Sequence, residues 1–195
     1  MIPVRKVKKP RGFDAEVKLP GDAWLADNPA AARPPALWAA YTAALSEGFG
    51  NLCGYAAMLD PTGGTVDHFL SFKNRRDLAY EWSNYRFASG PLNASKRNAD
   101  DTVLDPFEVG DGWFEIVLPS LQMRITDAVP AAYRAKAAFT LKRLNLRDGE
   151  RVIRWRKSWY DMYLAGRLTL DGLRGVAPLL AAAVEAQARQ TPAAP

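Results

Sequence analysis

The scarcity of cysteine and histidine constrains this chain more than any other feature of its sequence. Its 195 residues contain one cysteine, Cys53, and one histidine, His68. A disulfide scaffold needs paired cysteines, and a structural zinc site needs several cysteine or histidine ligands, so neither can form from this chain. The chain must therefore fold around a hydrophobic core, and its 48% of hydrophobic residues can supply one.

Charge and hydropathy narrow the classes of protein further. Lysine and arginine number 26 against 21 acidic residues, giving a net charge of +5, which favours a polyanionic partner. No apolar run approaches the roughly 18 residues of a membrane span, and the basic start of the chain lacks the apolar stretch of a secretory signal. We therefore expect a cytoplasmic protein with no membrane partner and with Cys53 as a free thiol.

The order of predicted elements indicates an α+β fold. Residues 1–33 are rich in proline, glycine and charge, and we expect a basic N-terminal arm with little regular structure. Residues 34–128 are expected to form the central unit, and residues 129–190 a helical region. The predicted elements are a helix over 34–47, a hairpin of strands 51–59 and 65–70, a helix over 91–100, a hairpin of strands 112–118 and 121–126, and helices over 130–146, 149–164 and 170–190.

The candidate chemistry lies between residues 65 and 98. The only histidine, His68, follows Asp67 at the end of a predicted strand. An imidazole titrates near neutrality and can act as a general base, while Asp67 and Asn93 offer the oxygen ligands that suit Mg²⁺. Adjacent residues of a regular strand point to opposite faces, so we expect irregular backbone between Asp67 and His68.

The predicted helix over 91–100 adds basic residues to this set. Asn93, Lys96 and Arg97 stand at positions i, i+3 and i+4, so they share one helix face. Lys96 and Arg97 are candidates for phosphate binding, and an ordinary solvated face is the alternative. Asn98 competes with Asn93 for the ligand role. His68 by itself could be a packed core histidine, but the neighbouring carboxylate and the Asn-x-x-Lys spacing favour a catalytic role.

In this stretch, about residues 53–106, the chain resembles the HNH, or ββα-metal, nucleases. That family combines a hairpin ending in an Asp-His or His-His pair, a loop asparagine, and a helix with a final His or Asn. The matching residues here are Asp67-His68, Asn84 in Trp-Ser-Asn-Tyr, and Asn93 in Leu-Asn-Ala-Ser-Lys. The resemblance implies that Asp67 and Asn93 bind Mg²⁺ or another divalent cation, and that His68 activates water.

The resemblance also implies supporting roles and a function. Asn84 would orient the loop that aims His68, and Lys96 would hold a phosphate. The cysteine pairs that bind structural zinc in many members are missing, so no structural zinc is expected. The implied activity is that of a metal-dependent endonuclease that hydrolyses DNA and leaves 5′-phosphate and 3′-hydroxyl ends, in a restriction or anti-phage defence role with a protein partner.

Two other functions stay open at this stage. One is a catalytically inactive module that binds nucleic acid or a partner on the same scaffold. The other is a pure protein-interaction subunit, which would not retain DNA even at low salt.

The last third of the chain carries a second basic signal. Residues 131–160 contain nine lysines and arginines against two acids. Arg147, Arg151 and Arg154 are spaced four and three apart, which predicts a stripe on one helix that could contact DNA phosphates. A solvated helix face is the alternative, and the aromatic residues of the same helix are expected to pack into the core.

Overall fold

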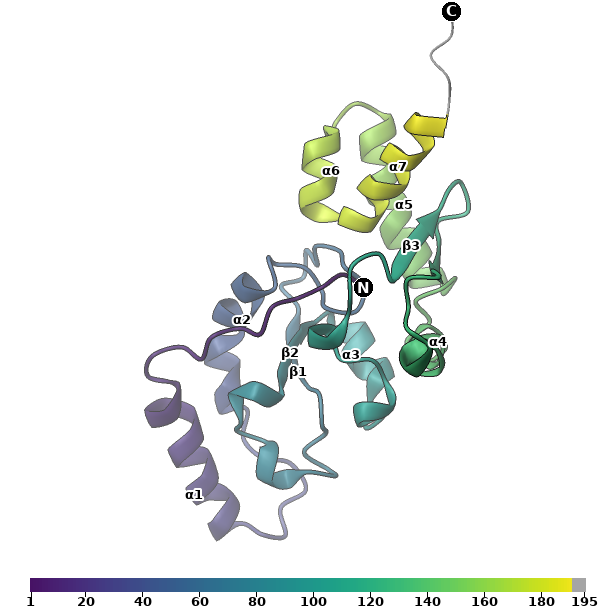
Figure 1. Ribbon diagram of the computed structural model, residues 1–195. Coiled ribbons are helices and arrows are strands. Elements are labelled where there is room, and N and C mark those ends of the chain that lie inside the picture. The colour runs from purple at the N-terminus through teal and green to yellow at the C-terminus, as the bar shows by residue number, and fades with distance from the viewer. Residues whose placement is uncertain (191–195) are drawn as a thin grey trace, which may run out of the picture.

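The computed structural model describes residues 1–190 and has an α+β fold with two small antiparallel hairpins (Figure 1). The first sheet pairs β1 (Thr65–His68) with β2 (Tyr85–Ala88). The second pairs β3 (Phe114–Val117) with β4 (Gln122–Ile125). The predicted fold class is therefore confirmed at this level, and so is the predicted second hairpin.

The first predicted hairpin is wrong in its pairing. β1 follows the predicted turn, where Asp60 accepts hydrogen bonds from the backbone and hydroxyl of Thr62. Residues 51–59 contain only an isolated bridge between Leu52 and Leu59, and the partner of β1 is β2. β1 therefore pairs with a strand that lies beyond a loop, and all four residues of that strand, β2, are buried.

In the N-terminal half, the observed helices begin and end at other residues than predicted. The arm is not without structure, because Phe13 and Val17 are buried and anchor helices across residues 14–27. The helix predicted over 34–47 begins only after Pro34 and Pro35, with a 3₁₀ turn. The observed helices are a π-helix at Asp14–Lys18, α1 (Leu19–Asp27), a 3₁₀ helix at Leu37–Tyr41, α2 (Thr42–Gly48), and α3 (Gly90–Lys96).

The C-terminal half follows the prediction closely, apart from one break. The helix predicted over 170–190 is two helices, because Ala177 takes a non-helical conformation before Pro178. The helices here are α4 (Ala131–Arg143), α5 (Glu150–Leu164), α6 (Leu170–Val176) and α7 (Pro178–Gln190). Short 3₁₀ helices lie at Arg76–Leu78, Trp82–Asn84, Asp100–Thr102 and Pro106–Glu108.

Two hydrophobic clusters pack on either side of the first hairpin. The aromatic cluster joins the N-terminal helices to one face of β1–β2, and its largest members are Phe13, Trp38, Phe49, Tyr80, Trp82, Tyr85 and Phe87. The C-terminal core joins β3–β4 and α4–α7, and it also takes buried residues from the stretch 53–58. The helical region beyond residue 129 therefore shares its core with the central unit.

No helix within residues 1–190 is long and apolar enough to cross a lipid bilayer.

Candidate functional site

An open pocket of about 940 Å³ gathers several of the predicted site residues. Asp67 and His68 reach it from β1, Asn93 from α3, and Arg97 from the end of α3. Its remaining lining residues come from the loop after β1, the region after α3, and the N-terminal half: Arg33, Ala36, Trp38, Ala39, Thr42, Thr65, Val66, Ser71, Phe72, Lys73, Gly90, Ala94 and Asn98. Asp67, His68 and Asn93 thus all line one pocket, as predicted, but lining a pocket does not by itself bring their functional groups together.

The backbone at this pocket contradicts one expectation. β1 runs regularly through both Asp67 and His68, which pair with Arg86 and Tyr85 of β2, so no irregularity separates them. Their side chains therefore point to opposite faces of the strand, as the alternation of a regular strand requires. The carboxylate and the imidazole consequently sit in different surroundings.

His68 is held on the face that packs against the aromatic cluster. Its Nε2 lies 2.8 Å from the carbonyl oxygen of Ala79. Because a carbonyl can only accept, Nε2 carries the proton and Nδ1 keeps a lone pair. Trp38 and Phe72 meet the ring edge-on at centroid distances of 4.5 and 5.2 Å, and Tyr85 at 5.0 Å.

The protonation of His68 follows from this burial. His68 is only 8% exposed to solvent. Burial lowers the pKa of His68 below its usual 6.5, against the opposing effects of the Ala79 hydrogen bond and the Asp67 charge. The ring is therefore neutral at pH 7 and present as the form that can accept a proton.

Asp67 is enclosed on the other face of the strand. Its Oδ1 accepts a hydrogen bond from the ammonium of Lys96 at 3.0 Å, and its Oδ2 accepts one from the hydroxyl of Tyr55 at 2.7 Å. Burial raises the pKa of Tyr55 well above its usual value, so the hydroxyl remains a donor. Asp67 is 1% exposed, and both of its oxygens are engaged inside the protein.

Lys96 does not take the place expected of a phosphate-binding residue. Its side chain is fully buried and donates to Asp67 and to the carbonyl oxygens of His68 and Phe69, at 2.8 and 2.9 Å. Arg97 leaves the helix as its C-cap with φ 52° and ψ −123°. The two residues therefore do not share a solvated helix face, and only Arg97 is exposed to a ligand.

Asn84 lies outside the pocket and fastens the loop that follows β1. Its Oδ1 accepts from the backbone of Leu70 at 2.8 Å, and its Nδ2 donates to the carbonyls of Leu70 and Leu78 at 2.9 and 3.1 Å. Leu78 precedes Ala79, the residue that holds the His68 ring. This geometry suits the predicted orienting role, which stays a prediction as far as catalysis is concerned.

Asp100 is a residue that the sequence analysis missed. Its Oδ1 accepts from the backbone of Ser71 at 2.7 Å and its Oδ2 from the side chain of Asn74 at 2.5 Å. It adopts a left-handed conformation, with φ 48°. Asp100 thereby ties the loop that carries Phe72 and Lys73 to the segment after α3. An aspartate shortly after a helix end is the only sequence signal for this role.

The rim of the pocket is basic. Arg33, Lys73 and Arg97 line it and are exposed. Within residues 1–190, none of the three forms an ion pair with a carboxylate. Exposed cations without carboxylate partners remain available to phosphate groups.

Asn93 links the helix to the strand. Its Nδ2 donates to the carbonyl of Val66 at 3.2 Å, which leaves its Oδ1 as an acceptor at the pocket. Asp67 and Asn93 are the residues that would hold a divalent cation, but as they stand they do not fit one. The carboxylate is already neutralised by Lys96, and no second carboxylate lines the pocket.

The predicted arginine stripe lies elsewhere in the molecule. Arg147 precedes α5 and has Asp148 at 3.7 Å, while Arg154 pairs with Glu150 at 2.5 Å, and Arg151 is exposed on α5. α5 lies beside α6 and α7 in Figure 1, away from β1 and β2. The stripe is therefore not continuous on one helix, and it does not extend the rim of the pocket.

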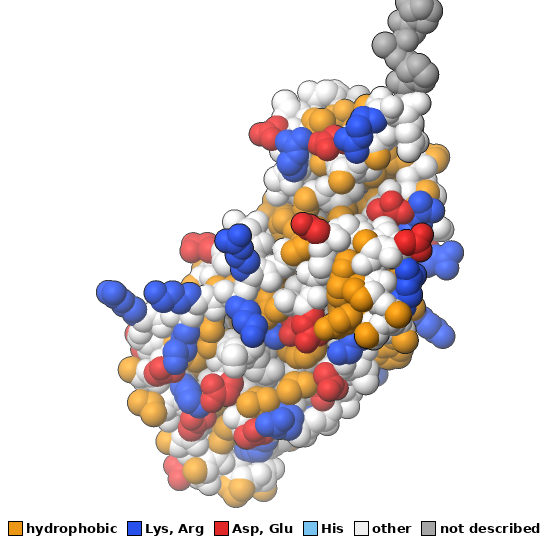
Figure 2. Space-filling view, in the orientation of Figure 1, with side chains coloured by type: hydrophobic (Ala, Val, Ile, Leu, Met, Phe, Trp, Pro, Cys, Tyr) orange, Lys and Arg blue, Asp and Glu red, His pale blue; other side chains and the backbone are white. Residues whose placement is uncertain are grey.

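The face of the molecule drawn in Figure 2 shows no uniform basic field. Lys and Arg side chains project from the left of the face in Figure 2, with acidic side chains among them. The predicted arm contributes exposed cations, of which Lys9 pairs with Asp14 at 2.5 Å. The arm is fixed to the fold where Trp82 donates to the carbonyl of Val7.

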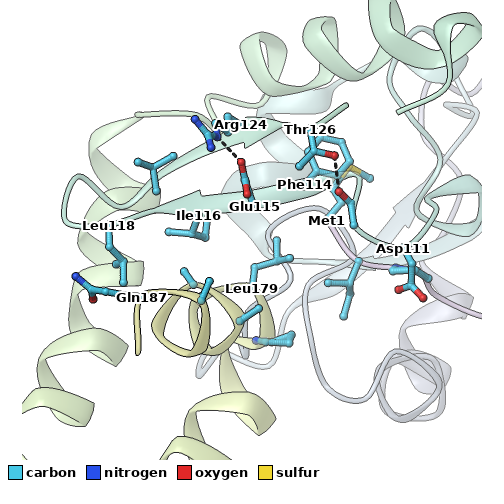
Figure 3. Close-up of a pocket in the computed structure, with 18 of the residues that line it drawn as sticks. Met1, Asp111, Phe114, Glu115, Ile116, Leu118, Arg124, Thr126, Leu179 and Gln187 are labelled. Atoms are coloured by element: carbon cyan, nitrogen blue, oxygen red, sulfur yellow. Dashed lines mark hydrogen bonds and ion pairs between the residues drawn. The ribbon is translucent and has the colours of Figure 1, made fainter. Parts of the chain in front are cut away.

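A second pocket, of about 580 Å³, separates the β3–β4 hairpin from α7 (Figure 3). Ile116 and Leu179 face it from opposite sides, and Glu115 and Arg124 form an ion pair at its edge. Its lining includes no histidine, cysteine or lysine and none of the predicted site residues. The pocket at β1 is therefore the stronger candidate for chemistry.

Comparison with known proteins adds no identity. No family model and no curated protein matches this chain.

Proposed function

We propose that the pocket at β1 is the active site of an endonuclease that hydrolyses phosphodiester bonds of DNA. The observation that carries the proposal is His68, whose Nε2 is fixed on Ala79 and whose Nδ1 keeps a lone pair, beside a rim of cations without carboxylate partners. An oriented neutral imidazole is a general base, and cations attract the phosphate backbone.

The reaction follows from these groups. Nδ1 of His68 takes a proton from a water molecule, and the water oxygen forms a bond to phosphorus. The bond from phosphorus to the 3′ oxygen breaks, and that oxygen takes up a proton from solvent. Lys73, Arg97 and Arg33 offset the negative charge that develops on the phosphoryl oxygens. Because Asp67 and Asn93 do not fit a divalent cation as they stand, no step is assigned to one.

The order of elements also supports the proposal. β1, β2 and α3 follow one another as two strands and a helix. Asp67 and His68 end the first strand, Asn84 precedes the second, and Asn93 lies on the helix, in the order of the HNH resemblance. A defence role remains a prediction of that resemblance, and a cytoplasmic location remains a prediction from the hydropathy and the basic start of the sequence.

The test is cleavage of a supercoiled plasmid, with Mg²⁺, with Mn²⁺ and with EDTA. The wild type, His68→Ala and a control variant, Lys157→Ala, are compared, since Lys157 is an exposed residue of α5. We expect His68→Ala to reduce cleavage by about 10²- to 10⁴-fold, the usual cost of losing a general base, and Lys157→Ala to leave it unchanged. Equal cleavage by the wild type and His68→Ala would overturn the assignment.

The ion pair between Lys96 and Asp67 favours a second candidate, a non-catalytic module that binds nucleic acid. A neutralised carboxylate is poorly suited to holding a catalytic cation. Such a module would leave the plasmid intact in every condition yet retain labelled DNA on a filter in EDTA. Retention should fall when Lys73 and Arg97 are both replaced by alanine. A pure protein-interaction subunit would retain no DNA at low salt.

A further inference from the structure

We infer that the ammonium of Lys96 occupies the cation position at Asp67 and keeps divalent cations out of it. This assignment concerns what binds beside the carboxylate. It holds whether the pocket hydrolyses DNA or only binds it, so it goes beyond the proposed function and can fail independently of it.

The coordination of Lys96 is complete. An ammonium has three N–H donors, and here three oxygens accept from it: Asp67 Oδ1 at 3.0 Å, the His68 carbonyl at 2.8 Å and the Phe69 carbonyl at 2.9 Å. The Lys96 side chain is 0% exposed, and that of Asp67 is 2% exposed. The ammonium thus sits in a closed cage of oxygens with no solvent side.

The same oxygens are those that a divalent cation prefers. A carboxylate and two backbone carbonyls are hard oxygen ligands, as Mg²⁺, Mn²⁺ and Ca²⁺ require. Lys96 therefore satisfies with one charge a set of ligands that could otherwise contribute to a metal site. A divalent cation and the ammonium cannot both use Asp67 Oδ1 in this geometry.

Charge balance gives the second reason for exclusion. Lys96 and Asp67 together are neutral. The neighbouring buried carboxylate, Asp105, is already paired with Arg86, whose Nε and Nη2 each lie 2.6 Å from one of its oxygens. Arg86 is the β2 partner of Asp67. A divalent cation added here would therefore leave two uncompensated positive charges in a buried site, which is strongly unfavourable.

Removing the charge of Lys96 should open the site. Methionine ends one atom short of the ammonium nitrogen, so Lys96→Met keeps the packing of the stem and leaves space among the three oxygens. Lys96→Arg keeps the positive charge and is the matched control. Asp67→Asn removes the carboxylate that any metal would need.

The experiment is calorimetric titration of the full-length chain with Mn²⁺, repeated as thermal unfolding with and without Mn²⁺. We expect Lys96→Met to bind one Mn²⁺ at least about tenfold more tightly than the wild type and to gain thermal stability from it. Lys96→Arg should resemble the wild type, and the double variant Lys96→Met/Asp67→Asn should lose the site.

Other outcomes decide against the inference. It is overturned if the wild type binds one Mn²⁺ as tightly as Lys96→Met and if Asp67→Asn removes that binding. Should Lys96→Met fold only in Mn²⁺, the metal has replaced the ammonium and the inference is supported. Should Lys96→Met not fold at all, the wild type and Asp67→Asn decide: an Asp67-dependent Mn²⁺ site in the wild type overturns the inference, and its absence supports it. None of these outcomes depends on whether the protein cleaves plasmid DNA.

Discussion

The two faces of β1 place their polar side chains, Asp67 and His68, in different surroundings. On one face, Asp67 is closed in by Lys96 and Tyr55, and both of its oxygens have partners inside the protein. On the other face, His68 has one nitrogen fixed on Ala79 and the other left with a lone pair. The same strand thus supplies a carboxylate whose oxygens are both engaged inside the protein and an imidazole that keeps a lone pair. The difference teaches that adjacency in sequence does not make two residues one site.

The largest expected effect tests the closed face. Lys96→Ala removes one partner of a buried ion pair and leaves Asp67 charged and two carbonyls without a donor, which should cost about 3–5 kcal/mol of unfolding free energy. Urea denaturation followed by circular dichroism measures it. Lys157→Ala, which breaks the exposed pair with Asp161, should cost under about 0.5 kcal/mol. Similar losses in both variants would mean that Asp67 is not closed in as described.

The next largest effect tests the hydrogen bonds of Asn84, which fasten the loop near His68. Asn84→Ala leaves the backbone groups of Leu70 and the carbonyl of Leu78 without the partner that the buried Asn84 side chain supplies. The expected loss is about 2 kcal/mol of unfolding free energy. Amide hydrogen exchange should rise in residues 70–79 and stay unchanged in β3 and β4. Uniform exchange across the chain would contradict a local role for Asn84.

The burial of His68 should affect how the stability of the protein depends on pH. Burial holds the pKa of His68 below the unfolded value of 6.5, so the unfolded chain binds more protons in the interval between the two pKa values. The stabilisation is therefore full above pH 6.5 and is lost as the pH falls toward the folded pKa. Comparing urea midpoints of wild type and His68→Gln across this range isolates the contribution. Parallel curves would show that His68 has the same pKa in both states.

The smallest expected effect concerns the rim. Arg97 has φ 52° and ψ −123°, a conformation that glycine adopts at little cost and other residues do not. Arg97→Gly should therefore raise the unfolding free energy by about 1 kcal/mol while it weakens DNA retention. Arg97→Ala should weaken retention without the gain in stability. Unchanged stability in Arg97→Gly would contradict backbone strain at Arg97, and unchanged retention in both variants would contradict its contact with DNA.

The residues near the pocket show how far sequence reasoning reaches. The pattern around Asp67, His68 and Asn93 predicted that their side chains meet in one pocket. All three residues line it, but the Asp67 carboxylate is enclosed on the face of β1 opposite His68. The same pattern made Lys96 a candidate for phosphate binding, with a solvated face as the alternative. The structure buries Lys96 instead, because helical spacing gives relative direction but not which side meets the core. Asp100 carries no local pattern beyond its position after a helix, so its contact with Ser71 is visible only in three dimensions.

Elements formed by residues close together in the chain could be predicted from the sequence alone. The β3–β4 hairpin turns within a few residues, and the helices α4 and α5 follow apolar periodicity, so short-range signals were enough to predict them. The partner of β1 was decided by tertiary structure, since β2 lies beyond an intervening loop and no local window of sequence contains both strands. The different surroundings of Asp67 and His68 arise from that same choice, because the partners of each side chain depend on which segments the fold brings against each face of β1.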